Sequence, residues 1–94
     1  MIKHDNIIYA RDIHAIGGVE TYVYELVKKY HKYDIAVVTK KIDQKQKNRL
    51  EEYCRVYVHK DEPIDCKVII TNWDTSILDY VCKDAKCYTG IHTD

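Results

Sequence analysis

The sequence has little of several things that mark particular classes of protein. Its 94 residues include one proline, three glycines and no phenylalanine, and fifteen basic residues balance fifteen acidic ones. This zero net charge gives no field that would favour nucleic acid as a partner. No apolar run approaches the ~20 residues of a membrane span, and no basic-then-apolar leader opens the chain. We therefore expect a single cytoplasmic globular domain.

The sequence also lacks the spacing of a metal site. Its four cysteines are separated by eleven, fifteen and four residues, so they form no Cys-x-x-Cys pair, and no two histidines lie four residues apart. We expect no metal, no cofactor, and thiols that stay reduced within a packed fold. These cysteines are Cys54, Cys66, Cys82 and Cys87.

What the chain does contain is an alternation of short apolar runs and helical patterns. Apolar residues from Val19 to Tyr30 recur at i, i+3, i+4 and i+7, which predicts an amphipathic helix. Asp43 followed by Gln46 predicts a capped polar helix that runs to about Tyr53. Five apolar runs predict strands; they are Asn6–Ala10, Ile35–Thr39, Arg55–Val58, Val68–Thr71 and Cys87–Thr89.

A third helix is expected between the last two of these strands. Asp74 or Thr75 would cap it, and its inward side would be made by Ile77, Leu78, Val81 and Cys82. The order of the elements predicts an α/β, Rossmann-like three-layer sandwich that takes in residues 1–94. Its mainly parallel sheet of about five strands would carry helices on both faces, with the expected strands in the order third, second, first, fourth, fifth.

The expected core follows from the inward positions of these elements. It consists of Ile7, Ile8, Val23, Leu26, Val27, Val37, Val38, Val68, Ile69, Ile70, Ile77 and Val81.

This topology also predicts where a ligand would bind. Parallel sheets bind ligands beyond the carboxyl ends of the strands, where the strand order reverses. Here the reversal falls between the first and fourth strands, bordered by residues 11–18 and 72–74, with Gly90–Asp94 alongside.

Gly17 and Gly18 stand at this place, directly before the amphipathic helix. Two residues without a Cβ allow a ligand to approach the backbone, and the unpaired N–H groups of a helix N-terminus favour a phosphate. The alternative is a tight structural turn. The pattern is neither a dinucleotide fingerprint nor a P-loop.

The segment Ile16-Gly17-Gly18-Val19-Glu20, followed by the helix and the second strand, resembles the start of family 4 glycosyltransferases. These are retaining, nucleotide-sugar-dependent enzymes of the GT-B fold, in which two Rossmann-like domains face a cleft. The ending Gly90-Ile91-His92-Thr93-Asp94 is similar to the exit of that family's fifth strand, where a histidine faces the cleft. The resemblance runs along essentially the whole chain in order.

The resemblance implies roles for individual residues. Gly17 and Gly18 would bind the donor diphosphate through backbone N–H groups, and His92 would be the catalytic residue beside the transferred sugar; the alternative for His92 is a solvent-exposed strand end. Four further residues are candidates to line the cleft, although surface placement is favoured for the first two; these four are Arg11, His14, Asn72 and Trp73.

The chain also departs from the family, because it matches only about the first half of the first domain and lacks the second domain with its Glu-rich motif. We therefore expect the N-terminal piece of a glycan-biosynthesis enzyme, inactive alone. Its partners would be a nucleotide-sugar donor and a glycan or lipid-linked acceptor. The alternative is a small non-catalytic α/β interaction module.

Two surfaces bear on partners. A basic cluster in the middle of the chain is interpreted as a solvated helix face, with weak contact to an anionic inner membrane surface as the alternative. A fifth strand without a covering helix predicts a homo-oligomer, with Tyr80, Cys82 and Tyr88 as contacts. The basic cluster comprises Lys28, Lys29, His31, Lys32, Lys40, Lys41, Lys45, Lys47 and Arg49.

Overall fold

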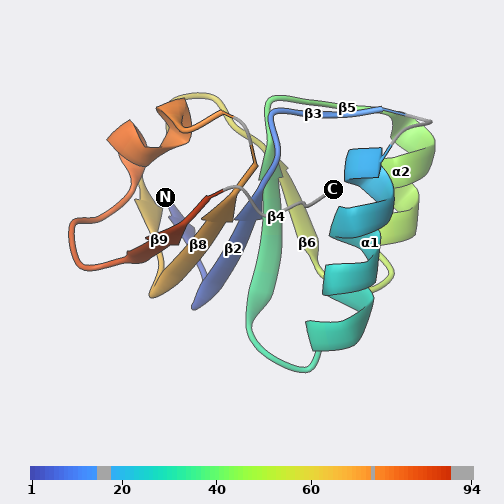
Figure 1. Ribbon diagram of the computed structural model, residues 1–94, viewed down its shortest axis with the longest axis horizontal. Coiled ribbons are helices and arrows are strands. Elements are labelled where there is room, and N and C mark those ends of the chain that lie inside the picture. The colour runs from blue at the N-terminus through green and yellow to red at the C-terminus, as the bar shows by residue number, and fades with distance from the viewer. Residues whose placement is uncertain (15–17, 73, 90–94) are drawn as a thin grey trace.

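The computed structural model describes residues 1–14, 18–72 and 74–89 (Figure 1). Nine strands, two α-helices and one 3-10 helix lie within this part of the chain. In chain order they are β1 (Ile2–Lys3), β2 (Asn6–Tyr9), β3 (Asp12–Ile13), α1 (Gly18–Tyr30), β4 (Ile35–Thr39), β5 (Lys41–Ile42), α2 (Gln44–Leu50), β6 (Arg55–Val58), β7 (Ile64–Asp65), β8 (Val68–Thr71), η1 (Ser76–Tyr80) and β9 (Lys86–Tyr88).

The main sheet has five parallel strands in the order β6-β4-β2-β8-β9. The expectation of an α/β fold with a mainly parallel five-stranded sheet is therefore confirmed. The full strand order differs from the single series that the sequence predicts, because four short strands outside the main sheet form two further parallel pairs, β1–β7 and β3–β5. Strands of two residues are too short to show any periodicity in a sequence.

One face of the sheet packs against both α-helices. Ile8, Val37 and Val56 from the sheet form a buried cluster with Val23 and Val27 of α1 and Leu50 of α2. The amphipathic pattern of α1 is confirmed, since both of its inward valines are fully buried. Figure 1 shows α1 and α2 together on one side of the sheet.

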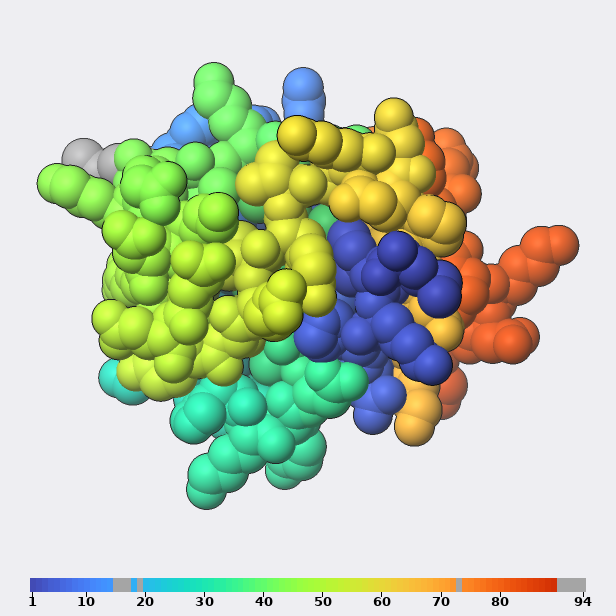
Figure 2. Space-filling view, turned by 180° about the vertical axis from the view of Figure 1, so that it is seen from behind, coloured from blue at the N-terminus to red at the C-terminus, as the bar shows by residue number. Residues whose placement is uncertain are grey.

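The opposite face has a different cover. Ile7, Tyr9 and Ile69 of the sheet pack there against Ile64 of β7 and Ile77 of η1. The prediction of α-helices on both faces is wrong for this side, where the β1–β7 pair and the 3-10 helix form the layer. From behind, the N-terminal residues lie against the segment that contains β7 (Figure 2).

The expected third helix is a five-residue 3-10 helix. Val81 has an extended backbone and makes a parallel bridge with Ile64, and the N–H of Cys82 donates to the Ile64 carbonyl at 3.0 Å. Val81 and Cys82, which the sequence predicts to be helical, therefore pair with Ile64 instead. A contact with a residue far away in the chain therefore overrides the local helical pattern.

The polar helix α2 has the predicted N-cap. The Asp43 carboxylate accepts hydrogen bonds from the backbone N–H groups of Lys45 (3.0 Å) and Gln46 (3.3 Å), which satisfies two of the unpaired donors of the first turn. The helix ends at Leu50, earlier than the predicted end near Tyr53.

Eight of the twelve expected core residues are buried, and four are only half-buried. The four are Leu26, Val68, Ile70 and Val81. Val68 and Ile70 alternate with buried Ile69 along β8, so they lie on the side of the sheet that carries α1. No described element covers β8 and β9 on that side.

Near the amino ends of the strands, His4 links the start of β2 to β4 and β6 through hydrogen bonds. His4 Nδ1 lies 2.6 Å from Asp34 Oδ1, and His4 Nε2 lies 2.8 Å from the hydroxyl of Tyr57 in β6. The backbone N–H of Asp5 donates to the other Asp34 oxygen at 2.8 Å. The hydrogen bond from His4, followed by that from Asp5, lowers the pKa of Asp34.

Two leucines provide a test of the packing. Leu50 is 1% exposed and Leu26 is half-buried. We expect Leu50→Ala to reduce the free energy of unfolding by about 2–5 kcal/mol, as for other buried leucines, and Leu26→Ala to cost clearly less because solvent already reaches its side chain. Urea denaturation of both variants measures the difference. Equal losses would contradict this assignment of the core.

The His4–Asp34 contact makes a prediction about pH. Because the folded-state pKa of Asp34 lies below its ordinary value of 3.8, the contact stabilises the fold above that value, and its contribution disappears as the pH falls through the folded-state pKa. Asp34→Asn should therefore flatten the acid side of the stability profile, whereas Asp84→Asn on an exposed turn should leave it unchanged. Thermal melts between about pH 2 and pH 6 cover this range. An unaltered acid limb in Asp34→Asn would contradict the prediction.

Candidate functional site

The predicted ligand crevice lies where β2 and β8 end side by side. Tyr9 and Thr71, the last residues of these strands, are register partners. From β2 the chain runs through residues 10–17 to α1, while from β8 it runs through residues 72–75 to η1 on the other face. The two connections leave toward opposite faces, so the carboxyl ends of β2 and β8 form the reversal point where ligands bind in such sheets.

A tyrosine and a carboxylate join the two strands at this end. The Tyr9 hydroxyl donates to Asp74 Oδ2 at 3.2 Å, and the N–H of Ser76 donates to Asp74 Oδ1 at 2.8 Å. Burial, followed by the charge of Asp74, raises the pKa of Tyr9 to about 12. Hydrogen bonds from Ser76 and Tyr9 together with the charge of Arg11 lower the pKa of Asp74. At neutral pH the pair is thus a phenol that donates to a carboxylate.

The loop after β2 is anchored through its backbone. The Arg11 carbonyl accepts hydrogen bonds from the N–H groups of Lys40 (2.9 Å) and Lys41 (3.0 Å) and from Thr39 Oγ1 (3.1 Å). The Arg11 side chain is exposed and lies 3.8 Å from the Asp12 carboxylate. The backbone of Arg11 is thus held in place while its guanidinium stays in solvent. Arg11 can therefore contact an anionic ligand at the rim of the crevice. His14 is exposed in the same loop.

Gly18 is the first residue of α1. A Cβ built on it would lie more than 4 Å from the atoms that it could meet elsewhere in the described fold, and its φ is not in the left-handed region. Neither packing nor backbone conformation therefore requires glycine at this position. Within the described residues, a side chain at position 18 would meet open space.

Glu20, in the first turn of the same helix, is 6% exposed and accepts a hydrogen bond from Thr21 Oγ1 at 3.0 Å. A carboxylate in the first turn interacts favourably with the helix dipole. It also opposes the binding of a second anion at this terminus, so Glu20 weakens any phosphate site formed there.

Asn72 follows β8 and is 9% exposed. Its Oδ1 is buried and has no hydrogen-bond partner. A buried acceptor without a hydrogen-bond donor destabilises a fold. Asn72 therefore brings to the predicted crevice a polar atom that is unpaired within the described fold.

Three of the predicted site residues, Gly17, Trp73 and His92, lie outside the described residues. Among the others, Arg11 lies just after β2 and Asn72 just after β8, whereas His14 is exposed in the loop before α1 and Gly18 is the first residue of that helix. Sequence reasoning missed the Tyr9–Asp74 pair. The available signal was a tyrosine at the end of a continuous apolar strand, since a buried phenol needs a hydrogen-bond partner.

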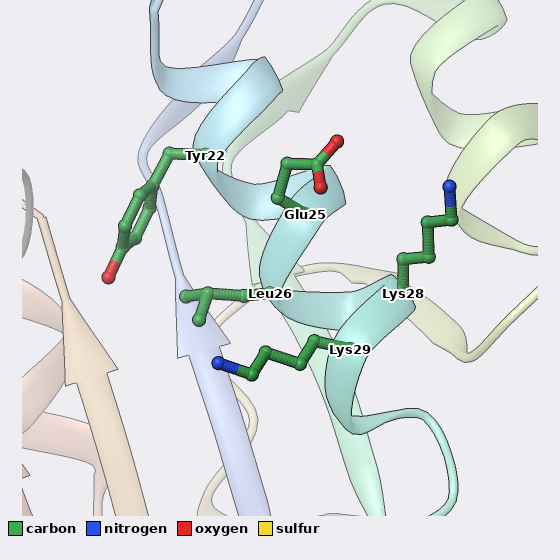
Figure 3. Close-up of a pocket in the computed structure, with 5 residues that line it drawn as sticks. All are labelled: Tyr22, Glu25, Leu26, Lys28 and Lys29. Carbon is green, nitrogen blue, oxygen red and sulfur yellow. The ribbon is translucent and has the colours of Figure 1, made fainter.

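A hollow elsewhere on the described surface is formed by the side chains of a single helix. One cavity of about 450 Å³ lies on the outer side of α1, lined by Tyr22, Glu25, Leu26, Lys28 and Lys29. Figure 3 shows Tyr22, Leu26 and Lys29 extending toward the side of β2, while Lys28 points toward α2. These are mainly long side chains on one helix, and they converge on no common point.

Two of the four thiols, those of Cys54 and Cys66, show little reactive character. Burial raises the pKa of both Cys54 and Cys66 to about 11, which keeps them protonated at neutral pH. Within residues 1–14, 18–72 and 74–89, no three side chains of His, Cys, Asp or Glu are grouped so that they could hold a metal ion. In the same ranges, no helix is long and apolar enough to cross a bilayer.

Comparisons with protein-family models, with curated proteins and with solved structures found no match to this chain.

Asn72 provides a test of whether the crevice is built for packing. Leucine has the same branched shape and number of heavy side-chain atoms and needs no hydrogen bond, so Asn72→Leu should raise the free energy of unfolding by about 1 kcal/mol or more. Asn72→Asp should lower it, because it buries a charge. Guanidinium denaturation distinguishes these results. A loss of stability in Asn72→Leu would show that the amide is satisfied in solution and has a structural role.

Proposed function

We propose that this chain is the N-terminal piece of a GT-B glycosyltransferase that transfers a sugar from a nucleotide-sugar donor to a glycan or lipid-linked acceptor. It would supply the first half of the first Rossmann-like domain. The observation that supports the proposal is that α1 begins at Gly18, where a Cβ would meet open space within the described fold, in a chain whose parallel sheet reverses its strand order between β2 and β8. The resemblance of residues 16–20 and 90–94 to family 4 glycosyltransferases adds the substrate class.

The chemistry of the crevice supports a phosphate ligand. The first N–H groups of α1 lack partners within the helix and point outward, and the absence of a side chain on Gly18 lets phosphate oxygens approach them. Arg11 adds an exposed positive charge at the rim. Glu20 works against this attraction, so we expect binding to be weak, with a Kd around 1 mM or about 4 kcal/mol.

The sugar would lie toward β8. In the proposed arrangement His92 is near the transferred sugar and assists catalysis through a hydroxyl or through charge at the reacting centre. Asn72, His14 and Trp73 would line the same cleft. Because transition-state stabilisation requires groups from both sides of a cleft, the 94-residue chain alone would bind the donor without transferring the sugar.

A second candidate function is a small α/β interaction module without catalysis. The observation that favours it is the open edge of β9, whose three residues are all exposed. Titration with a nucleotide diphosphate sugar separates the two candidates, since an interaction module has no reason to bind it.

Replacing Gly18 tests the phosphate site directly. Because a Cβ meets open space at this position, Gly18→Val should fold as the parent does but lose binding, since its β-branched side chain would occupy the path of the phosphate. Amide shifts during titration with UDP-glucose report this, and parent shifts at Gly17, Gly18, Val19 and His92 would support the proposal. Shifts elsewhere, or none at several millimolar, would leave the glycine pair as a structural turn.

Glu20→Gln tests whether the charge of Glu20 weakens phosphate binding, as proposed. It removes a negative charge from the first turn of α1 while keeping the shape of the side chain, so it should increase the affinity for UDP-glucose. The measured quantity is the Kd from the same titration, and Glu25→Gln on the exposed side of α1 is the control. Weaker binding in Glu20→Gln would mean that the ligand does not approach this terminus with its phosphates.

A further inference from the structure

Strand β9 forms one edge of the main sheet. It pairs with β8 on its inner side, and within the described chain no strand pairs with its outer side (Figure 1). All three of its residues are exposed, and Tyr88 keeps 54% of its surface in contact with solvent. An unpaired edge of this kind is a template for another strand.

The hydrogen bonds of β9 show which of its backbone groups are free. The N–H of Lys86 donates to the Lys67 carbonyl at 2.8 Å, and the Tyr88 carbonyl accepts from Thr71 Oγ1 at 3.3 Å. Both residues therefore direct their backbone groups toward β8. Since successive residues of a strand direct these groups to opposite sides, the N–H and C=O of Cys87 point outward from the sheet.

The side chains alternate as well. Lys86 and Tyr88 are register partners of Val68 and Ile70, the half-buried residues on the α1 side of β8. Cys87 is the partner of Ile69, which is buried against η1 on the other side. Paired residues of neighbouring strands share a face, so Lys86 and Tyr88 lie on the α1 side and Cys87 lies on the η1 side.

This arrangement is complementary to itself. If β9 pairs antiparallel with a second β9 about Cys87, the outward N–H and C=O of each Cys87 meet those of the other. In the same register Lys86 faces Tyr88 of the other copy, twice, and no lysine faces a lysine. A twofold axis through the pair would make one continuous sheet of the two copies, with their half-buried Val68 and Ile70 on the same side.

We propose that a second copy of this chain occupies the β9 edge, paired antiparallel in the register centred on Cys87. The lysine restricts the pairing to this register, because other alignments lose the Lys–Tyr contacts or oppose the two lysines. Edge strands that are short and carry lysine avoid indiscriminate association, and here the same lysine selects one partner geometry.

The homo-oligomer expected from the sequence is thereby a twofold dimer. Of its three expected contacts only Tyr88 takes part, since the Tyr80 hydroxyl donates to Asp61 and the Cys82 thiol donates to the Cys66 carbonyl.

Sedimentation equilibrium of the full chain under reducing conditions tests the proposal. The parent should show a concentration-dependent dimer. Tyr88→Lys places lysine opposite lysine twice and should weaken dimerisation roughly tenfold or more. Tyr33→Lys adds the same charge at a tyrosine that is 64% exposed after α1, and it should leave the dimer unchanged. The swap Lys86→Tyr with Tyr88→Lys restores both cross-strand contacts and should recover dimerisation.

Thiol cross-linking identifies the register independently. Residues opposed in a hydrogen-bonded antiparallel pair have Cα atoms about 5.5 Å apart, a distance that a disulfide spans. Diamide, which accepts the two electrons and two protons of two thiols, should therefore join the copies through Cys87. Cys82→Ser should still cross-link and Cys87→Ser should not. A monomer at about 1 mM, equal losses in Tyr88→Lys and Tyr33→Lys, or a cross-link that maps to another cysteine would overturn the proposal.

Discussion

The fold depends on one strand that is buried on both faces. In β2, Ile7 and Tyr9 pack toward η1 and the β1–β7 pair, whereas Ile8 packs toward α1 and α2, and all three are at most 1% exposed. Water cannot reach the backbone N–H and C=O groups of such a strand, so they must be paired by a neighbouring strand on each side, here β4 and β8. Together with β4, which also contributes to both clusters, this strand separates the two halves of the core.

The two ends of the sheet have different characters. At the amino ends, His4, Asp34 and Tyr57 satisfy one another and connect β6 and β4 to the start of β2. At the carboxyl ends, Arg11 keeps an exposed guanidinium, Gly18 faces open space and Asn72 Oδ1 has no partner in the described fold. These features of the carboxyl end are the ones on which the functional proposal depends.

The main strands and the first helix could be predicted from the sequence because they depend on local patterns of apolar residues. The continuous apolar runs of β2, β4 and β8 and the stripe of α1 identify buried parallel strands and their crossover without any long-range information. The topology then places residues 11–18 beside residues 72–74. The rest depends on contacts that no local pattern encodes. Pairing of Val81 with Ile64 shortens the third helix, and the bond from Tyr9 to Asp74 joins residues far apart in the chain. Leu26, Val68 and Ile70 look like core in the sequence, but whether an apolar residue is buried depends on which faces other elements cover.

The connectivity of β2 has a consequence for the order in which the protein acquires its structure. Asn6 is the register partner of both Ile35 and Val68, so β2, the first strand of the main sheet in chain order, is enclosed only when β8 has been made. Contacts between residues so distant in sequence slow folding, and until then the run Ile7-Ile8-Tyr9-Ala10 has no partner on one side. During synthesis, a segment that is almost fully buried in the finished protein thus stays in water until its last partner strand has been made.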